Sequence, residues 1–277
     1  MSNPWVILNS VEQSIKEKIE NYGVELGKWP EIKINYGIKT GYNDAFIINE
    51  ETRNTIISSC GSSAEREMTA NLIRPILRGR DIKRNSYTWA GYYIILTYFD
   101  SHKFLKEKCP SIFKYLSRFE SQLKNRGQCR YLSNGKTRKP SDADYPGYPG
   151  MHHWLELDNC PSSKYLDVFD NRIIAWQRIT QENCFCITQK GMLVLDSMAF
   201  ISVPEKMLNN LCIILNSKLF YYWMRKNVHE YGESGFRLSN QFVEIFPAVL
   251  DAVDNDEDIY KKYHLTAEEI NVVENTK

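Results

Sequence analysis

The stretch INYGIKTGYNDAFIIN, residues 34–49, consists of two short apolar runs joined by a glycine-rich turn. Gly37 and Gly41 suit such a turn because glycine adopts positive φ angles and lets another group approach the backbone closely. Between them, Lys39 and Thr40 supply a cation and a hydroxyl, which are groups that contact phosphates. Two interpretations therefore remain open at this point: an ordinary hairpin turn and a phosphate-contacting loop.

The sequence around this turn predicts alternating helices and strands. The flanks of the turn, residues 32–36 and 45–48, are predicted to be paired strands. Upstream, residues 9–22 place apolar side chains three and four positions apart, which predicts an amphipathic helix. Downstream, residues 50–58 and 64–72 are predicted to form two further helices.

The next segment, LIRPILRGRDIKRN at residues 72–85, is strongly basic. It holds one acid, Asp81, and five bases: Arg74, Arg78, Arg80, Lys83 and Arg84. Arginine forks match phosphates and guanine edges, and Gly79 lets a backbone come close. The alternative is that Arg80 and Asp81 form a structural ion pair that fixes a turn.

A second basic tract follows an aromatic strand and a helix. Residues 87–99 predict a central strand whose aromatic side chains pack in the core, and residues 110–126 predict a helix that begins at Pro110. Residues 121–141 contain no acid and six bases: Lys124, Arg126, Arg130, Lys136, Arg138 and Lys139. We expect a long exposed loop here, either a solvated face or a mobile arm that follows a nucleic-acid backbone.

The last third predicts short strands and then helices. Residues 154–157, 172–178, 183–188 and 198–203 have the composition of strands. Residues 204–227 predict one or two buried helices with a break near Asn216. Two short helices follow in the tail, the second with Thr266 and Glu269 in a capping box. The mixture predicts an α+β fold: a mixed sheet with packed helices and a helical C-terminal part.

The charge is unevenly distributed along the chain. The net charge of the 277 residues is +1, but 32 bases and 26 acids precede Asp251, whereas the residues from Asp251 onward hold three lysines and eight acids. A basic body suits a polyanionic partner, and an acidic tail alternatively serves solubility.

Composition also bounds the location and the chemistry. With 43% hydrophobic residues the chain can bury a sizeable core. It has no run of the length of a membrane span and no secretion-signal pattern at its start, so we expect a cytoplasmic protein without membrane contacts. Seven cysteines without framework spacing fit reduced thiols. The adjacent His152 and His153 have no Cys or carboxylate at a ligand-like offset, so no metal site is expected.

These segments in this order resemble the TaqI-like C-terminal specificity domain, the target-recognition module of type IIG restriction-modification enzymes and related adenine DNA methyltransferases. The resemblance covers nearly the whole chain except the basic loop. The matching sequences are KIENYG, GIKTGYNDAFII, IRPILRGRDIKR, the helix at residues 110–126, MHHWLEL, RIIAWQRIT, LNNLCIILNSKLFYYWM, EIFP and the tail DEDIYKKYHLTAEEI.

The resemblance implies a recognition fold that binds double-stranded DNA and presents its target to a methyltransferase or endonuclease domain or subunit. It divides the chain into a helical connector at 1–30, the recognition domain at 31–250 and an acidic helical tail at 251–277. The expected DNA contacts are Lys39, Thr40, Arg78, Arg80, Lys83, Arg84, Arg126, Arg130, Lys136, Arg138, Lys139 and Arg178.

Catalytic motifs of such enzymes are missing from this sequence. A methyltransferase needs a glycine-rich loop for S-adenosylmethionine and an Asn/Asp-Pro-Pro-aromatic motif. Asn3-Pro4-Trp5 lacks one proline of that motif. Glu31-Ile32-Lys33 lacks the upstream acid of an Mg²⁺ nuclease site. We therefore expect no cofactor and no catalysis in this chain, with S-adenosylmethionine and Mg²⁺ bound by the catalytic partner.

Two other functions stay open from the sequence. The first is a protein-interaction subunit that docks on a methyltransferase through the apolar segment 208–224 and the acidic tail. The second is a DNA-modifying enzyme of unrecognised chemistry.

Overall fold

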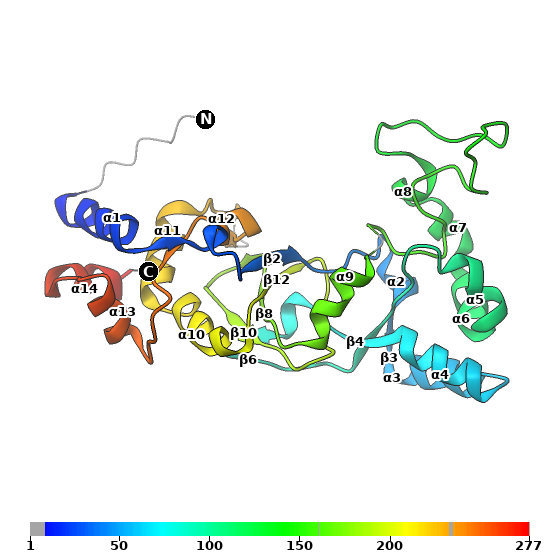
Figure 1. The fold of residues 1–277 in the computed structure, drawn as a ribbon, viewed down its shortest axis with the longest axis horizontal. Coiled ribbons are helices and arrows are strands. Elements are labelled where there is room, and N and C mark those ends of the chain that lie inside the picture. The colour runs from blue at the N-terminus through cyan, green and yellow to red at the C-terminus, as the bar shows by residue number, and fades with distance from the viewer. Residues whose placement is uncertain (1–8, 160, 233–234, 277) are drawn as a thin grey trace.

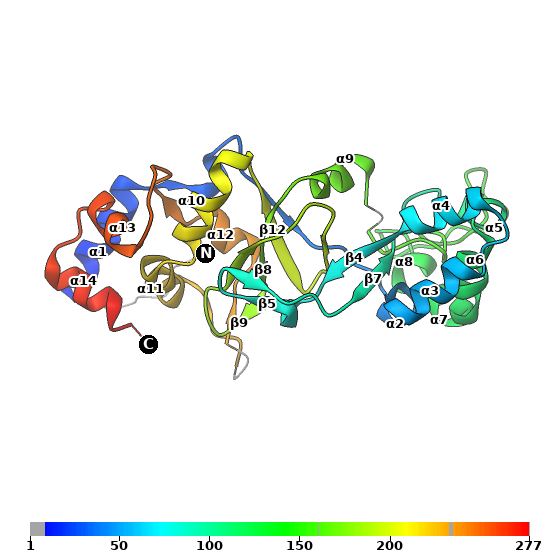
Figure 2. The same ribbon diagram turned by 90° about the horizontal axis from the view of Figure 1, so that it is seen from below.

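The structure is a computed structural model that describes residues 9–159, 161–232 and 235–276. The Asn3-Pro4-Trp5 sequence lies outside these ranges. The molecule is elongated (Figure 1): the first and last helices form one end, most strands lie in the middle, and helices α2 to α8 gather at the other end. The view turned by 90° shows the same order along the long axis (Figure 2). Among the described residues, no helix combines the length and the apolar character needed to cross a membrane.

A four-stranded antiparallel sheet in the middle separates two hydrophobic cores. Its strands, in spatial order, are β10 (Phe185–Ile187), β8 (Ile174–Gln177), β12 (Met198–Ser202) and β2 (Lys33–Tyr36). Side chains alternate between the two faces of a strand. Trp176 and Ile201 accordingly enter the core at the helical end, which we call the first core, whereas Ala175 and Phe200 enter the second core. Both faces of β8, β10 and β12 are largely buried, so these three strands are mostly apolar, whereas the edge strand β2 exposes Lys33 and Tyr36.

The first core is covered by the terminal helices. They are α1 (Ser10–Tyr22), α10 (Glu205–Leu215), α11 (Lys218–Asn227), α12 (Asn240–Glu244), α13 (Asp256–Lys262) and α14 (Ala267–Glu274). Asn9 caps α1 in a capping box with Glu12, and Thr266 caps α14 in the same way with Glu269. The capping box predicted at Thr266 and Glu269 is therefore confirmed.

The acidic tail is fastened to the N-terminal helix. The Glu269 carboxylate accepts hydrogen bonds from Ser14 Oγ at 2.7 Å and from Lys18 Nζ at 2.7 Å. Burial opposes ionisation of Glu269, but the bonds from Lys18, Ser14 and the Thr266 N–H outweigh burial and lower its pKa to about 2. Helices α1 and α14 consequently lie side by side at one end of the molecule (Figures 1 and 2).

The second core lies under a mixed sheet at the other end. The strands, in order, are β11 (Leu193–Val194), β4 (Ile73–Leu77), β7 (Tyr92–Ile95) and β3 (Ile47–Asn49); β11 and β4 are parallel and the other pairs are antiparallel. The helices here are α2 (Asn43–Phe46), α3 (Glu50–Ser58), α4 (Ser63–Leu72), α5 (His102–Lys108), α6 (Pro110–Leu116), α7 (Glu120–Lys124) and α8 (Gly127–Arg130). As predicted, β7 is an inner strand.

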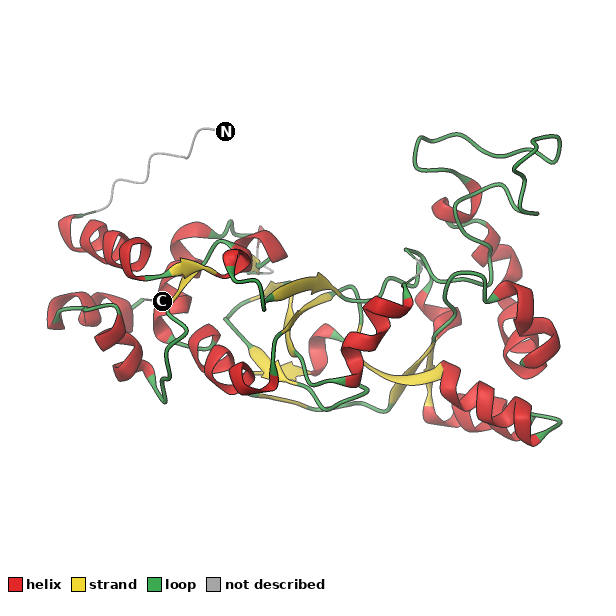
Figure 3. Ribbon diagram, viewed as in Figure 1, coloured by secondary structure: helices red, strands yellow, loops and turns green. Residues whose placement is uncertain are grey.

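Short elements join these parts. They are β1 (Val24–Glu25) paired with β14 (Pro247–Ala248), β9 (Ile179–Thr180) paired with β13 (Phe236–Arg237), β5 (Ile82–Lys83) paired with β6 (Ser86–Tyr87), helix α9 (Ser163–Leu166), and the 3₁₀ turns η1 (Leu26–Lys28), η2 (Gly79–Asp81), η3 (Ser117–Phe119) and η4 (Asp167–Asp170). Figure 3 shows the long loop after α8, of which residues 131–159 are described and which projects from the α5–α8 end.

The predicted α+β class with mixed sheets is confirmed, whereas the hairpin at residues 34–49 is wrong. β2 pairs with β12 and β3 pairs with β7, so the two flanks of the turn belong to different sheets. Each flank joins the edge of a four-stranded sheet that packs on a core, which is more stable than an isolated two-stranded hairpin. The glycine-rich segment is therefore a crossing between sheets.

Three other boundaries differ from expectation. Residues 154–157 form turns and not a strand, the helix predicted at 110–126 is interrupted by η3, and in the predicted strand 87–99 only Tyr92–Ile95 extends the sheet. The predicted break near Asn216 is confirmed: α10 ends at Leu215, and Ser217 Oγ accepts the Phe220 N–H at 3.0 Å to cap α11.

The apolar residues of α10 and α11 lie inside the first core of this same chain, including Leu211, Leu215, Phe220 and Met224, each fully buried. They are therefore not available as the docking surface that the interaction-subunit hypothesis required.

Candidate nucleic-acid interface

Chain segments that leave both sheets meet between the two cores. The backbone hydrogen bonds that join them run from Ile38 N to Val194 O at 2.8 Å, from Leu195 N to Leu77 O at 3.0 Å and from Arg178 N to Ser197 O at 3.1 Å. We call this region the junction and define it as residues 37–41, 78–81, 177–178 and 195–197. In Figure 1 it lies between the β2–β12 pair and β4.

The structure explains why glycine is required at both Gly37 and Gly41. A Cβ on Gly37 would lie 2.2 Å from the Leu195 carbonyl oxygen, so only glycine allows the two backbones to approach this closely. Gly41 has a φ of +73°, and a Cβ there would lie 2.4 Å from Asp158 Cγ. The two glycines therefore hold the segment in place, and neither needs a ligand to explain it.

Lys39 and Thr40 point to opposite environments. The Lys39 side chain is 46% exposed, and its Nζ lies 3.8 Å from Asp158 Oδ2. Thr40 is only 2% exposed, and its hydroxyl donates to Asn43 Oδ1 at 2.6 Å. Lys39 is thus accessible to a polyanion, whereas Thr40 is enclosed by the protein.

Arg78 is fixed inside the basic turn. Its Nε and Nη2 donate to the Asp81 carboxylate at 3.2 and 2.9 Å, and its guanidinium lies 4.0 Å from the centre of the Tyr92 ring. The hydrogen bonds to Asp81 raise the pKa of Arg78. The sequence left open a structural ion pair between Arg80 and Asp81; the structure forms that pair with Arg78.

Arg80 and Lys83 project outward from this turn. Both are exposed, because Gly79 packs on the Gln177 side chain and the Arg78–Asp81 pair closes the inner side of the turn. Arg84 is also exposed but bonds away from the junction, donating to Asn216 O at 2.9 Å and to Asn183 Oδ1 at 3.0 Å.

Arg126 is a buried side chain that holds several chain segments together, and it is not a surface cation. The residue is 6% exposed. Its guanidinium donates to four carbonyl oxygens, those of Leu123 at 3.1 Å, Thr40 at 2.7 Å, Trp154 at 2.9 Å and Glu156 at 2.6 Å, and approaches Asp158 Oδ1 at 3.4 Å. It therefore ties the opening segment, the end of α7 and the far end of the basic loop together.

The basic loop carries cations of two kinds. Arg130, Lys136 and Lys139 are exposed. Arg138 is half-buried, because its Nη1 donates to the Gly150 carbonyl oxygen at 2.5 Å and so closes the loop on itself. Of the exposed loop predicted at residues 121–141, residues 131–141 are loop and mostly exposed, whereas the first part of the tract is helical in α7 and α8.

Arg178 borders the junction beside an exposed aromatic ring. Its Nη1 donates to the Asp196 carbonyl oxygen at 2.9 Å, and its guanidinium lies 4.5 Å from the centre of the Tyr36 ring. Tyr36 is 49% exposed. Burial raises the pKa of Asp196, and the charges of Lys39 and Arg178 oppose that rise.

The structure therefore divides the expected contacts. We remove Thr40, Arg78 and Arg126 from the proposed DNA contacts, because each is enclosed or saturated by intramolecular partners. The accessible cations among the expected residues are Lys39, Arg80, Lys83, Arg130, Lys136 and Lys139, with Arg84, Arg138 and Arg178 partly engaged.

Sequence reasoning missed the acids that balance these cations. Asp158 faces both Lys39 and Arg126, and Asp196 lies beside Lys39 and Arg178. Both acids are far from their partners along the chain, and neither stands in a motif, so no local pattern indicated them.

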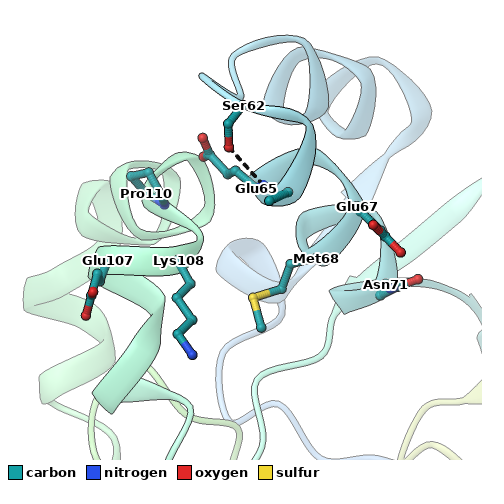
Figure 4. Close-up of a pocket in the computed structure, with 9 residues that line it drawn as sticks. Ser62, Glu65, Glu67, Met68, Asn71, Glu107, Lys108 and Pro110 are labelled. Atoms are coloured by element: carbon teal, nitrogen blue, oxygen red, sulfur yellow. Dashed lines mark hydrogen bonds between the residues drawn. The ribbon is translucent and has the colours of Figure 1, made fainter.

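A pocket of about 580 Å³ lies away from the junction, between α4 and the α5–α6 turn (Figure 4). Ser62, Met68, Lys108 and Pro110 contribute to its walls. The adjacent Glu65 accepts hydrogen bonds from Ser111 N at 3.0 Å and Ser111 Oγ at 2.6 Å, which ties α4 to α6. None of the expected DNA contacts borders this pocket.

An α+β domain with accessible cations around the junction and along the loop has a surface suited to a polyanion. The profile of the TaqI-like C-terminal specificity domain family matches residues 74–248, which is more than half of the sequence. The chain belongs to this family, and membership supports a role in DNA target recognition.

Two solved structures are similar to the chain. The type IIG restriction endonuclease BpuSI aligns over 96% of this chain with 13% identity and a TM-score of 0.49. The type IIL restriction-modification enzyme MmeI, solved in complex with DNA, aligns over 78% with 13% identity and a TM-score of 0.42. The aligned region covers 28% of the BpuSI chain and 23% of the MmeI chain, so this chain spans about a quarter of either enzyme. No curated protein sequence matches it.

Proposed function

We propose that this chain is the double-stranded DNA recognition part of a bacterial restriction-modification protein. In this role it positions a methyltransferase or endonuclease domain or subunit on a target sequence and is itself non-catalytic. The observation that carries the proposal is the family match over residues 74–248, which contains the turn that presents Arg80 to solvent.

The accessible cations would serve as the DNA contacts. Lys39 and Lys83 have flexible ammonium groups, which suit phosphates, whereas the Arg80 fork suits either a phosphate or the O6 and N7 atoms of guanine. Arg130, Lys136 and Lys139 would follow the backbone from the loop. Arg78 and Arg126 act behind these groups as positioning residues, since they hold the basic turn and the base of the loop.

The catalytic steps would belong to the partner. S-adenosylmethionine and Mg²⁺ would be bound there, since this sequence lacks the glycine-rich loop and the Pro-Pro motif of an amino-methyltransferase. We assign recognition to residues 31–250, with the connector at 1–30 and the tail at 251–277 supporting it through the α1–α14 contact.

Selection from a pool of random duplexes tests the proposal. A specificity domain should enrich one short sequence over repeated rounds, and the purified chain should release no methylated or cleaved DNA when S-adenosylmethionine and Mg²⁺ are added. Retention of DNA without enrichment would contradict target recognition. Turnover by the isolated chain would contradict the non-catalytic assignment.

A further inference from the structure

Three side chains with metal-binding groups meet beside the start of α5. One ligand atom each from Asp100, His102 and Glu156 lies within 4.8 Å of the other two. Asp100 belongs to the turn that follows β7, His102 is the first residue of α5, and Glu156 comes from the end of the basic loop. The fold thus brings the carboxylate of Glu156 to the neighbouring Asp100 and His102, 54 residues before it in the case of His102.

The surroundings hold the three groups in a fixed arrangement. Glu156 is fully buried, its Oε1 lies 2.5 Å from His102 Nδ1, and its Oε2 accepts the His153 N–H at 3.2 Å. The His102 ring is stacked on the His153 ring, with 4.5 Å between centroids, and meets the Tyr148 ring edge-on at 5.5 Å. Hydrogen bonds and packing of this kind orient the ligands of metal sites.

The backbone near the cluster is also set by specific contacts. Asp100 has a φ of +67°, a left-handed conformation that few non-glycine residues adopt. Leu157 N donates to Thr97 O at 3.1 Å, and Arg126 holds the Glu156 carbonyl oxygen at 2.6 Å. These contacts hold the end of the loop, which carries Glu156, against the segment that follows β7.

We propose that Asp100, His102 and Glu156 form a binding site for one divalent transition-metal ion. An imidazole with two carboxylates suits Mn²⁺, Fe²⁺ or Zn²⁺ better than Ca²⁺ or Mg²⁺, which favour oxygen ligands alone. Three protein ligands leave positions for water, and the Asp100 side chain, 44% exposed, gives solvent access to the site. The sequence predicted no metal site, because Glu156 reaches Asp100 and His102 only through the fold.

Two contacts must change for the ion to bind. Ligand atoms about 2 Å from one ion lie roughly 3 Å from each other, so the His102–Glu156 contact opens slightly and its bridging proton leaves. Asp100 also gives up its surface ion pair with Lys103, whose Nζ lies 2.8 Å from Asp100 Oδ2. Lys103 therefore competes with the metal ion for Asp100. Replacing Lys103 should raise the metal affinity, whereas replacing a ligand should lower it.

The bound ion would fasten the end of the basic loop to the start of α5. This inference does not depend on DNA recognition, since it rests on the cluster alone. Mn²⁺ is the best probe, because the cysteines of the described residues compete for Zn²⁺ but bind the harder Mn²⁺ poorly.

The test is calorimetric titration of the chelator-treated full chain with Mn²⁺. We expect one ion per chain, an affinity lowered at least tenfold in Asp100→Asn and in His102→Asn, and an affinity raised several-fold in Lys103→Ala. Glu107→Gln, an exposed acid on the same helix, is the matched control and should leave binding unchanged.

The absence of saturable Mn²⁺ binding, or equal affinity in the native chain and in Asp100→Asn, would overturn the proposal. The cluster would then be an ordinary His102–Glu156 hydrogen-bonded pair. Asp100 is largely a surface residue, so its variant should fold even if His102→Asn does not, and circular dichroism of each variant checks this.

Discussion

Arg126→Lys tests whether this residue organises the site or contacts DNA. A lysine ammonium has three donors on one nitrogen and cannot reproduce the arginine fork that spans four carbonyl groups. About two of the four acceptors should lose their partner, and each buried unsatisfied group costs about 1–3 kcal/mol, so we expect a loss of roughly 2–6 kcal/mol of unfolding free energy. Equilibrium urea unfolding measures this loss directly.

Arg130→Lys is the matched control for this change. Arg130 lies four residues further along and is exposed, so the same substitution should change the unfolding free energy by less than about 0.5 kcal/mol. Hydrogen exchange should also show faster exchange of the Leu157 amide in Arg126→Lys, because the end of the loop loses its anchor. Equal stability of the two variants, together with a smaller salt dependence of DNA binding in Arg126→Lys, would show that Arg126 contacts DNA and is not a structural residue.

Two further predictions concern the tail and the junction. The folded-state pKa of Glu269, about 2, lies below its ordinary 4.5, so its bonds from Lys18, Ser14 and the Thr266 N–H stabilise the protein above pH 4.5. This joint contribution, at most about 3 kcal/mol, is lost as the pH falls toward 2. In Glu269→Gln the unfolding free energy should therefore be lower at pH 7 and should fall less steeply between pH 4.5 and pH 2. If the pH dependence of the unfolding free energy is the same in the variant and the native chain, the stabilising role of the Glu269 carboxylate is contradicted. Gly37→Ala should destabilise the chain by about 2 kcal/mol or more, because the added Cβ meets the Leu195 carbonyl oxygen. Gly127→Ala is the control and should not destabilise the chain, because there is open space around Gly127. Equal melting temperatures of the two variants would contradict the close approach of Gly37 to Leu195.

Local patterns were sufficient for much of the fold. The caps at Asn9, Asn49 and Thr266 and the break near Asn216 were predictable, because capping and helix termination depend on residues a few positions apart. The α+β class followed from the same local signals. The crossing at residues 37–42 was not predictable, because strand pairing depends on which distant strand completes each core.

The candidate site likewise has features that the sequence predicts and features that it does not. Charge and glycine content identified the two basic segments, but composition cannot show whether an arginine faces solvent or the interior. Arg126 and Arg130 stand in one acid-free tract, yet Arg126 is buried by carbonyl groups of three segments and Arg130 is exposed. Asp158, which balances both Lys39 and Arg126, has no local sequence signal.

The central claim is that the chain binds duplex DNA through its accessible cations. Fluorescence anisotropy of a labelled random-sequence duplex over a series of salt concentrations measures this most directly. We predict that the logarithm of the binding constant falls linearly with the logarithm of the salt concentration, and that Arg80→Ala, at unchanged stability, reduces the slope by about one. Arg78→Ala should lower stability and leave the slope nearly unchanged, since Arg78 is bound to Asp81. The absence of DNA binding, or binding that does not weaken as salt rises, would contradict the account.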